Sequence, residues 1–417
     1  MLAEFREKNS EVANFDDSTC QLVHKRNKLS LDNLDYEEGK LFTDTHFPTT
    51  SALYWASMPS ELYGVISTDY EDMIEWVRAS EAFPDNPFWG SNGITPEDVR
   101  QGVIGDCWFM VAASALAEKP KRLEKIFLNV DAHEPASLNR DGFYAISLYT
   151  LGVKHTIVVD DYLPLQEFTN SAGDPEYETL FGMIAYDQSM WGVILEKAFA
   201  KLHGNYQHLI GGDPREASRT LTGAPTMMLD HTKDEVTADY IWSELLKHDF
   251  SYNMIYMNSR EQSDGAKRNA CGLQNGHAYV VLKAIELSNG ERLIKMRNPW
   301  GSETYKCDYS DSCPLWTDDY REEAGATYTA VNEGIFFIEL QDYYRQAEST
   351  VISYDTTGWY NDHFLMLNDQ TQSPGKWPFC GKRCTRHMVT VISTVDQPIY
   401  ITVYTWDTRS YPKECQK

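Results

Sequence analysis

The sequence predicts an α+β protein with a mainly helical first half and a mainly β second half. Before residue 212, apolar residues recur at three- and four-residue spacing, which is typical of helices packed on a core. After residue 213 they fall in short alternating runs, which are typical of strands. The chain of 417 residues is 42% hydrophobic and 13% aromatic, so it is long and apolar enough for two or three domains.

The first half divides into a polar extension and a region rich in apolar and aromatic residues. Residues 1–40 show little periodicity and are interpreted as the extension. Helices are predicted over 107–130 and over 190–204, with Gly204 as the C-terminal stop of the second. Between these helices, residues 144–164 are typical of a hairpin that ends in a strand.

The second half is predicted to begin with a helix over 234–248. Five strand-like segments follow, at residues 252–259, 276–287, 292–301, 327–331 and 334–340. Residues 347–417 carry further alternating segments around a turn-rich stretch with Pro374, Gly375 and Pro378. The alternation in this last region predicts a β-sandwich. About 70 residues make only a small sandwich, so the region is interpreted as part of one.

Charge and hydropathy exclude two classes of partner. The net charge of -25 disfavours a basic face for nucleic acid or anionic membranes. The longest apolar run, near residues 107–117, is about 11 residues and too short to span a membrane. The charged N-terminal sequence lacks the apolar stretch of a signal peptide, so a cytoplasmic location with free thiols is expected.

Eight cysteines without a regular spacing do not suggest a disulfide framework. Cys307 and Cys313 form one local cluster, and Cys380, Cys384 and His387 form another. The second cluster has ligand types suited to part of a zinc site, but no fourth ligand is evident. The alternative, that these are free cysteines buried as small apolar residues, is favoured by their general behaviour.

Cys107 lies where a polar, glycine-rich turn meets the predicted helix over 107–130. Asp106 is a suitable N-cap, so Cys107 would occupy the first turn, where the helix dipole lowers the pKa of a thiol. Gly102 and Gly105 would let the chain approach a substrate closely, and the Gln101 amide would complete an oxyanion hole with the Cys107 N–H. A buried core cysteine is the alternative.

A thiolate needs a base and a base needs an orienting group, and His277 and Asn298 are the candidates. They flank the hairpin signal Asn289-Gly290, and a tight turn there would put both side chains on the same sheet face. The register would still separate them by about four residues, roughly 13 Å. Contact therefore requires a longer loop or bulges within 278–290; otherwise the histidine is structural.

Three segments, "QGVIGDCWFMVAA", "GLQNGHAYVV" and "RNPWG", resemble the catalytic blocks of the calpain family of cysteine proteases, in the family's chain order. Supporting blocks are "FTDTHFP", "EWVRASE", "VVDDYLP", "LEKAFAKLHGNYQHLIGG" and "DSCPLW". The resemblance covers about residues 41–346. It implies a papain-like two-lobed core, with lobe 1 at 41–212 and lobe 2 at 213–346, followed by the partial sandwich at 347–417.

The resemblance also implies the roles of the candidate site residues. Cys107 would be the nucleophile, His277 the general base and then acid, and Asn298 the group that orients the imidazole. Gln101 would be the oxyanion donor. The substrate cleft would be lined by Trp300, Gly105 and Gly276. The implied function is intracellular limited proteolysis of protein substrates, read mainly through extended backbone, and a small regulatory subunit is not expected.

Calpain cores resemble calcium switches with one site in each lobe, and calcium requires oxygen ligands. In the first lobe the matching positions are Ser91, Gly93, Asp98 and Gln207. The family has an acidic residue where this chain has Gln207, so the site should be weaker. Asp98 as a simple helix cap is the alternative. The chain contains no calmodulin-like calcium-binding loop.

In the second lobe the sequence departs further from the calcium-binding pattern. The matching positions are Thr304, Asp311, Val331, Glu333 and Ile335. Thr304 and Ile335 replace family carboxylates, and only the neighbouring Glu303 offers a substitute. Weak or absent calcium binding is therefore predicted in this lobe, with Asp311 as an ordinary loop carboxylate as the alternative.

Three other functions remain open on the sequence. Transglutaminases also carry Cys-Trp and a downstream histidine, but their third residue is Asp where this chain has Asn298. A calpain-fold scaffold that binds proteins without cutting them would not need the intact set of Cys107, His277, Asn298 and Gln101. A competent core held closed until calcium or a partner arrives is the third.

Overall fold

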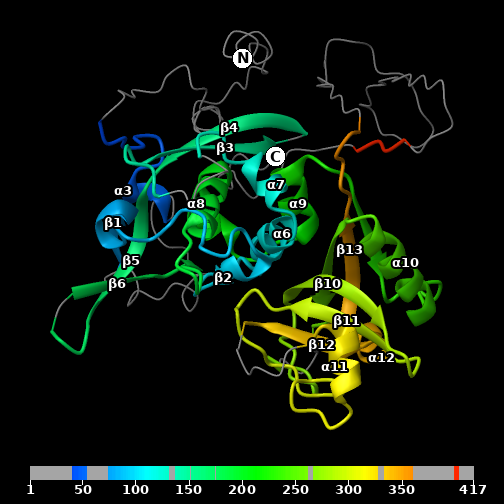
Figure 1. The fold of residues 1–417 in the computed structure, drawn as a ribbon. Helices are drawn as coiled ribbons and strands as arrows, with labels where there is room; N and C mark the ends of the chain where they lie inside the picture. The colour runs from blue at the N-terminus through cyan, green and yellow to red at the C-terminus, as the bar shows by residue number, and fades with distance from the viewer. Residues whose placement is uncertain are drawn as a thin grey trace, which may run out of the picture.

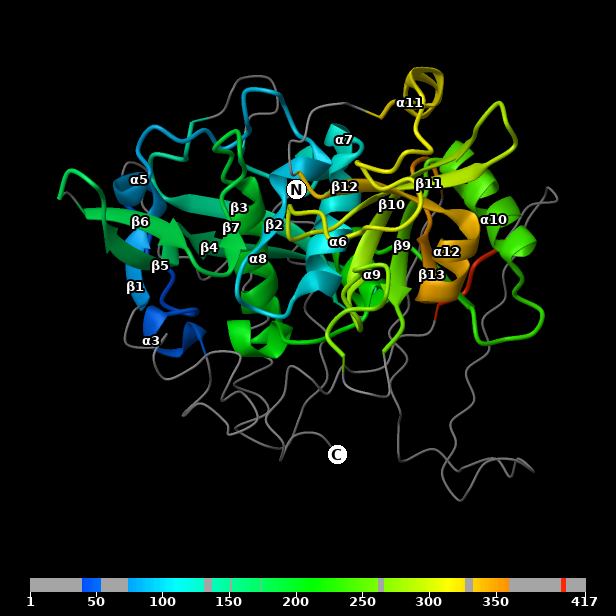
Figure 2. The same ribbon diagram turned by 90° about the horizontal axis from the view of Figure 1, so that it is seen from below.

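The computed structural model describes residues 40–53, 74–130, 137–150, 152–173, 175–261, 266–326, 333–359 and 399–402. Helix α6 (Cys107–Ala117) stands at the centre of the molecule (Figure 1). Most strands and helices of the earlier chain, residues 40–222, lie on one side of it, and a sheet of the later chain, residues 223–359, lies on the other (Figure 2). The elements that carry the candidate site meet at this helix.

The earlier chain contains small antiparallel sheets. Strand β1 (Ile74–Arg78) pairs with β5 (Tyr162–Thr169), which pairs with β6 (Pro175–Thr179). Strands β3 (Phe143–Thr150) and β4 (Val153–Asp160) form a hairpin, which confirms the hairpin predicted within 144–164. Strand β5 follows directly, as the pattern indicated.

The helices of the earlier chain are α3 (Thr49–Ala52), α5 (Ala79–Ala82), α6, α7 (Pro120–Glu124), α8 (Trp191–His203) and α9 (Pro214–Thr222). The helix predicted over 190–204 is confirmed, and Gly204 ends α8 with a φ of 99°. The helix predicted over 107–130 is wrong in length, because α6 ends at Ala117 and α7 begins at Pro120. Proline has no N–H to continue the helix.

The first half is less helical than the periodicity predicted. Strands β1 to β7 all fall within residues 41–212, alongside the helices. The longest of them contain β-branched and aromatic residues in runs such as 143–150 and 153–160, which favour a pleated surface. The described part of residues 41–212 is therefore a mixture of strand and helix.

The later chain forms a six-stranded antiparallel sheet in the order β12-β11-β10-β9-β13-β8. Its strands are β8 (Thr226–Asp230), β9 (Met254–Ser259), β10 (Ala278–Glu286), β11 (Arg292–Arg297), β12 (Ile335–Glu339) and β13 (Ala347–Ser353). Helices α10 (Ala238–Phe250) and α12 (Leu340–Gln346) pack on it, and α11 (Asp318–Ala324) lies in a connection. The predicted boundary between residues 346 and 347 falls directly before β13, which pairs within this sheet.

Helix α6 is buried along its whole length beyond the first residue. Every residue from Trp108 to Ala117 is buried, and only Cys107 is partly exposed. A helix that is apolar on all sides is expected to be enclosed by protein. The surrounding core includes residues of α8 and extends into the facing strands, with Tyr256 of β9 and Val280 of β10 among its members. This packing fixes α6 against the sheet.

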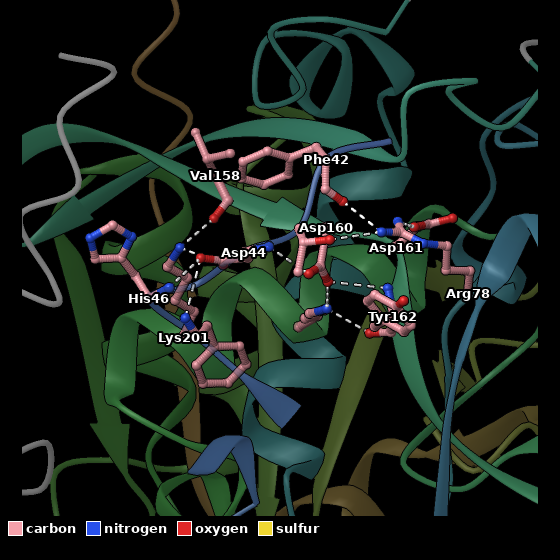
Figure 3. A network of polar contacts seen from close by, with 12 residues as sticks. Phe42, Asp44, His46, Arg78, Val158, Asp160, Asp161, Tyr162 and Lys201 are labelled. Carbon is pink, nitrogen blue, oxygen red and sulfur yellow. Dashed lines mark hydrogen bonds and ion pairs between the residues drawn. The ribbon is translucent and has the colours of Figure 1, made fainter. Parts of the chain in front are cut away.

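Three buried ion pairs hold the earlier chain together (Figure 3). They are Arg78 with Asp161 at 2.5 Å, Lys201 with Asp44 at 2.6 Å, and Lys197 with Asp160. The side chains involved are at most 4% exposed. The pairs join the segments "FTDTHFP", "EWVRASE", "VVDDYLP" and "LEKAFAK", so those sequence blocks meet at one place in the fold.

Several predictions fall outside the described residues. They are the extension over 1–39, the strand predicted at 327–331, the zinc candidates Cys380, Cys384 and His387, and most of the predicted sandwich over 347–417. None of the helices described combines the length and the apolar composition that a membrane-spanning segment needs.

Candidate active site

Cys107 begins α6, after a turn over residues 102–106 that follows the short strand β2 (Arg100–Gln101), which pairs with β7 (Gly182–Met183). Asp106 occupies the N-cap position, but its side chain makes no capping hydrogen bond. The predicted cap is wrong because Asp106 is completely buried and its carboxyl interacts with Glu196 of α8 instead.

Asp106 and Glu196 form a buried pair of carboxyl groups next to the start of α6. Burial raises the pKa of Asp106 to about 7, although the hydrogen bond with Glu196 opposes the shift. The pKa of Glu196 is raised well above its ordinary value by burial and then by the charge of Asp106. Glu196 Oε2 also accepts a hydrogen bond of 2.8 Å from the Gly182 N–H. Two buried, adjacent carboxylates repel each other, so one of the pair holds a proton at neutral pH.

The pKa of the Cys107 thiol is raised to about 11, where the sequence predicted a lowered value. Burial is the largest cause, and the neighbouring Asp106 charge adds to it. The backbone N–H groups at the start of α6 lower the pKa, as expected of a helix N-terminus, but by less than burial raises it. A hydrogen bond from the Ala278 backbone also stabilises the thiolate, so Cys107 lies beside the residue that follows His277.

His277 and Asn298 are in direct contact. His277 Nε2 lies 3.0 Å from Asn298 Oδ1. The orientation of the Asn298 amide is fixed, because Nδ2 donates to the Ser302 carbonyl at 2.9 Å and Oδ1 accepts the Trp300 N–H at 3.2 Å. Nε2 of His277 is therefore the protonated nitrogen that donates to Asn298, and Nδ1 is left as the basic nitrogen.

The register of β10 and β11 explains how the two residues meet. A three-residue loop over 288–290 replaces the predicted tight turn, since the Leu287 N–H bonds to the Glu291 carbonyl at 2.8 Å. The pairing then shifts by one residue between Val281 and Lys283. Continued beyond Val280 and Arg297, this register places His277 opposite Trp300 and on the same face as Asn298, and the rings of His277 and Trp300 lie 4.7 Å apart. The sequence had required a longer loop or bulges for this contact.

The imidazole of His277 is enclosed by aromatic rings. Its centroid lies 4.7 Å from that of Trp300 and 4.9 Å from that of Tyr279, and the residue is only 5% exposed. Burial lowers the pKa of His277 to about 4, and the hydrogen bond with Asn298 opposes that shift. The neutral imidazole is therefore the resting form at neutral pH.

Ser259 of β9 holds the backbone of His277 and was not singled out from the sequence. Its hydroxyl oxygen accepts the His277 N–H at 3.0 Å and donates to the Gln274 carbonyl at 2.6 Å. Its own N–H bonds to the His277 carbonyl at 2.9 Å. A lone serine in a strand gives no sequence signal for such a contact, because the partner is 18 residues away.

The remaining cleft candidates differ in what they contact. Gln101 Nε2 donates to the Ile104 carbonyl at 2.7 Å, and its Oε1 is buried without a hydrogen-bond partner. Gly102 approaches the chain itself and not open space, since a Cβ there would lie 2.1 Å from the Phe181 carbonyl oxygen. The predicted substrate role of Gly102 is therefore replaced by a packing role. Gly105 has room around it, and Gly276 is exposed with a φ of 61°.

The expectation that all cysteines are free thiols is wrong for one pair. Cys271, six residues before His277, is disulfide-bonded to Cys307. The Lys306 N–H also bonds to the Cys271 carbonyl at 3.0 Å, so the two loops lie together. Cys107 and Cys313 remain free among the described cysteines. The sequence spacing of 36 residues gave no local signal of this bond.

The first set of calcium candidates is only partly assembled. Both carboxylate oxygens of Asp98 accept hydrogen bonds, from the Thr95 N–H and hydroxyl at 2.9 and 2.7 Å and from Trp191 Nε1 at 2.9 Å. This is the helix-cap alternative, and burial raises the pKa of Asp98 to about 6. Ser91 and Gly93 lie in an exposed turn, and the Gln207 N–H bonds to the Leu53 carbonyl at 3.0 Å.

The second set contains an interacting group of acidic side chains. The pKa of Glu303 is raised to about 8 by burial and then by its hydrogen bond and charge interaction with Asp311. Glu333 contributes to the same repulsion. Thr304 and Ile335 supply no carboxylate, and Val331 lies outside the described residues. Glu303, which the sequence offered as a substitute for a missing ligand, therefore interacts directly with Asp311.

Comparison with known proteins gives the class of the protein first. The family described as calpain family cysteine protease matches residues 42–353. The chain therefore belongs to the calpain family, a family of hydrolases.

Individual relatives agree with this family. The chain is 31% identical over 317 residues to the calpain-type cysteine protease DEK1 of Arabidopsis thaliana, a match that covers 73% of this chain and 14% of that protein. It is 30% identical over 342 residues to human calpain-14, covering 81% of this chain and 46% of that protein. The chain thus spans less than half the length of these relatives. Among solved structures, the SERA5 proenzyme from Plasmodium falciparum matches with a TM-score of 0.26 and 13% identity over 71% of this chain and 69% of that one, too distant to carry an argument.

Proposed function

We propose that this chain is a calpain-like cysteine endopeptidase that cleaves proteins at few sites through Cys107, His277 and Asn298. The hydrogen bond of 3.0 Å between His277 Nε2 and Asn298 Oδ1 carries the proposal, because it leaves Nδ1 available as a base. Support comes from the position of Cys107, which is partly exposed at the start of α6 and hydrogen-bonded from Ala278.

The first step is a proton transfer from the Cys107 thiol to Nδ1 of His277. The raised pKa of the thiol and the lowered pKa of the imidazole make the neutral pair the resting state. Formation of the thiolate–imidazolium pair thus accompanies substrate binding, as general-base activation requires. The thiolate sulfur then attacks the peptide carbonyl carbon and forms a C–S bond, while the carbonyl electron pair moves to oxygen.

The second step breaks the peptide bond. The Cys107 N–H and the Gln101 side-chain amide donate to the oxyanion, and in other proteases loss of one such donor costs about 10²–10³-fold in kcat. The imidazolium gives its proton to the leaving amine, and the acyl group stays on sulfur as a thioester. His277 then takes a proton from water, and the water oxygen attacks the thioester carbon. The C–S bond breaks, the acyl group leaves as a carboxylic acid, and the imidazolium returns its proton to the sulfur of Cys107.

A thiol-reactive peptide probe tests the proposal. We expect labelling of Cys107 in the wild-type protein, found by mass spectrometry of the peptide that contains it, and no labelling at this position in Cys107→Ala. Cys107→Ala should also abolish peptide turnover while the thermal unfolding midpoint stays within a few degrees of wild type. Cys313→Ser, which removes the other free thiol among the described residues, serves as a control, since Cys107 should be labelled in this variant as in wild type.

The same probe separates the alternatives. Labelling that needs calcium indicates a core held closed, and labelling without calcium indicates constitutive activity. A folded protein that does not label under either condition contradicts the peptidase and favours the scaffold that binds proteins without cutting them.

We further propose that calcium binding is weak. Glu303, Asp311 and Glu333 would be the second-lobe ligands, and Asp98 with the Ser91 and Gly93 carbonyls and Gln207 the first-lobe ligands. A bound cation would offset the repulsion among the second-lobe carboxylates. Gln207 brings no charge and Ile335 brings no side-chain oxygen, so both sets are poorer in charge than the family pattern.

Calorimetric titration with calcium measures this directly. We expect dissociation constants of about 10⁻⁴ M or weaker. Glu303→Gln should weaken binding further, whereas Glu348→Gln, an exposed carboxylate in β13 outside both sets, should not change it. Tight uptake of two calcium ions would contradict the proposal.

A further inference from the structure

Arg297 is completely buried at the end of β11, directly before Asn298. Its guanidinium crosses from the later chain to the earlier one. Nη1 donates to the Ser114 hydroxyl at 3.1 Å, and Nη2 donates to the Val99 carbonyl at 2.7 Å and to the Glu97 carbonyl at 3.2 Å. One side chain therefore holds three separate points of the earlier chain.

Two of the contacted residues, Ser114 and Val99, lead to groups of the proposed reaction. Ser114 is on α6, two turns after Cys107, and its hydroxyl also donates to the Pro96 carbonyl at 2.9 Å. Val99 lies two residues before Gln101. The backbone of Arg297 pairs with Val280 of β10 on one side and with Ile335 of β12 on the other. The guanidinium thus connects the supports of the thiol, the oxyanion donor and the imidazole.

The environment of Arg297 indicates that its guanidinium serves to hold the later chain against the earlier chain. No carboxylate is among its hydrogen-bond partners. Backbone carbonyls and a hydroxyl accept from Nη1 and Nη2, and Nε is buried without a partner. Burial lowers the pKa of Arg297 to about 10, and the charges of Glu97 and Asp98 oppose the shift, so the group stays a cation at neutral pH. A buried cation held mainly by carbonyls requires a fixed geometry, since every displaced contact exposes an unmet charge.

We propose that Arg297 is a positioning residue, which sets the distance between the Cys107 thiol and the His277 imidazole by locking α6 and residues 97–99 onto β11. The inference rests on the proposed peptidase function. Its physical basis is that the thiol and the imidazole come from different parts of the chain, so their alignment depends on contacts that cross between them.

Lysine cannot replace arginine in this role. The lysine side chain is shorter, and its ammonium group lacks the planar arrangement of N–H donors that lets arginine bond a hydroxyl and two carbonyls in fixed directions. Arg297→Lys therefore keeps the charge and removes the alignment. A displacement of about 1 Å at reacting groups costs on the order of 10²-fold in rate.

The experiment combines steady-state kinetics with alkylation of Cys107 by iodoacetamide at pH 6. We expect Arg297→Lys to lower kcat by about 10²-fold with KM within about 3-fold of wild type. Alkylation of Cys107 should slow to the rate found in His277→Ala. In the double variant Arg297→Lys/His277→Ala it should slow no further, because Arg297 acts through the imidazole.

Arg78→Lys is the control, since Arg78 is also a buried arginine, 3% exposed, and its partner Asp161 belongs to the ion-pair network of the earlier chain. It should lower the thermal unfolding midpoint as Arg297→Lys does, yet leave the alkylation rate of Cys107 at the wild-type value. Equal slowing of alkylation in both lysine variants would make Arg297 merely structural and overturn the inference.

The remaining outcomes separate the two proposals. Wild-type alkylation in Arg297→Lys, or further slowing in the double variant, overturns the positioning role while the peptidase stands. Equal alkylation rates in wild type and His277→Ala contradict the proposed peptidase itself, and the inference falls with it.

Discussion

At the scale of single residues, burial decides the chemistry of the candidate site. The imidazole of His277 is enclosed, and the thiol of Cys107 is largely buried although the residue remains partly exposed, and burial disfavours the charged form of each. Their pKa values consequently move apart, to about 11 and about 4. A neutral resting pair results, and it becomes an ion pair only by proton transfer between its members.

The lowered pKa of His277 predicts activity in mildly acidic solution. Because burial disfavours the imidazolium, the neutral base persists as pH falls through 6.5, where an ordinary histidine becomes protonated. We expect the acid limb of kcat/KM for a peptide substrate to have its midpoint at about pH 4. A midpoint near 6.5 would mean that the imidazole is solvated and that the described enclosure by Trp300 is wrong.

Local pattern could predict which residues share a face but not how deeply they are buried. The alternation around Asn289-Gly290 put His277 and Asn298 on one side of the sheet, and their contact agrees with that parity. The partner of Asp106 could not be predicted, because Glu196 is 90 residues away and a carboxylate at a helix start ordinarily caps it. The predicted lowering of the Cys107 thiol pKa was wrong for a similar reason, because burial of the thiol and the charge of Asp106 depend on the tertiary fold.

At the scale of elements, two loops beside the site act as one unit. The loop that leads to His277 and the loop that follows Trp300 are joined by the disulfide between Cys271 and Cys307 and by the bond from Lys306 to Cys271. Gly272 packs so closely that a Cβ there would lie 2.1 Å from the Thr304 carbonyl oxygen. Periodicity within either loop contains no information about this pairing.

Removal of the disulfide is predicted to destabilise the protein. A cross-link that closes a loop of 36 residues restricts the unfolded chain, and such bonds typically contribute about 2–4 kcal/mol. We expect Cys307→Ser to lower the free energy of unfolding in urea by about that amount under non-reducing conditions. Cys313→Ser, which removes a free thiol six residues away, should have little effect. An equal loss in both variants would contradict the role of the cross-link.

At the scale of the whole molecule, buried ion pairs tie distant segments of the earlier chain together. Lys201 of α8 bonds both to Asp44 and to the Val158 carbonyl at 2.6 Å, so one ammonium joins the N-terminal segment to β4 (Figure 3). The sequence blocks that resemble the calpain family contain these charges. The blocks could be recognised in the sequence, but the pairing of a charge in one block with a charge in another could not be predicted from it.

Loss of one member of such a pair is predicted to be severe. Lys201→Met leaves the Asp44 carboxylate buried without its cation, which typically costs about 3–5 kcal/mol. The free energy of unfolding in urea measures this. Lys247→Met provides the comparison, because the Lys247 side chain is 62% exposed in its pair with Glu244, and pairs with an exposed member contribute under about 1 kcal/mol. Similar losses in the two variants would show that Lys201 is not an enclosed cation.

The place of β13 in the sheet order has a consequence for how the chain is made. Strand β13 is the last of the described strands, yet it lies between β9 and β8, and β8 pairs with no other described strand. A nascent chain on the ribosome therefore cannot complete this sheet until residue 353 has emerged. Until then β8 and one edge of β9 have no partner strand, and truncated chains that end before residue 353 would leave both edges open to aggregation.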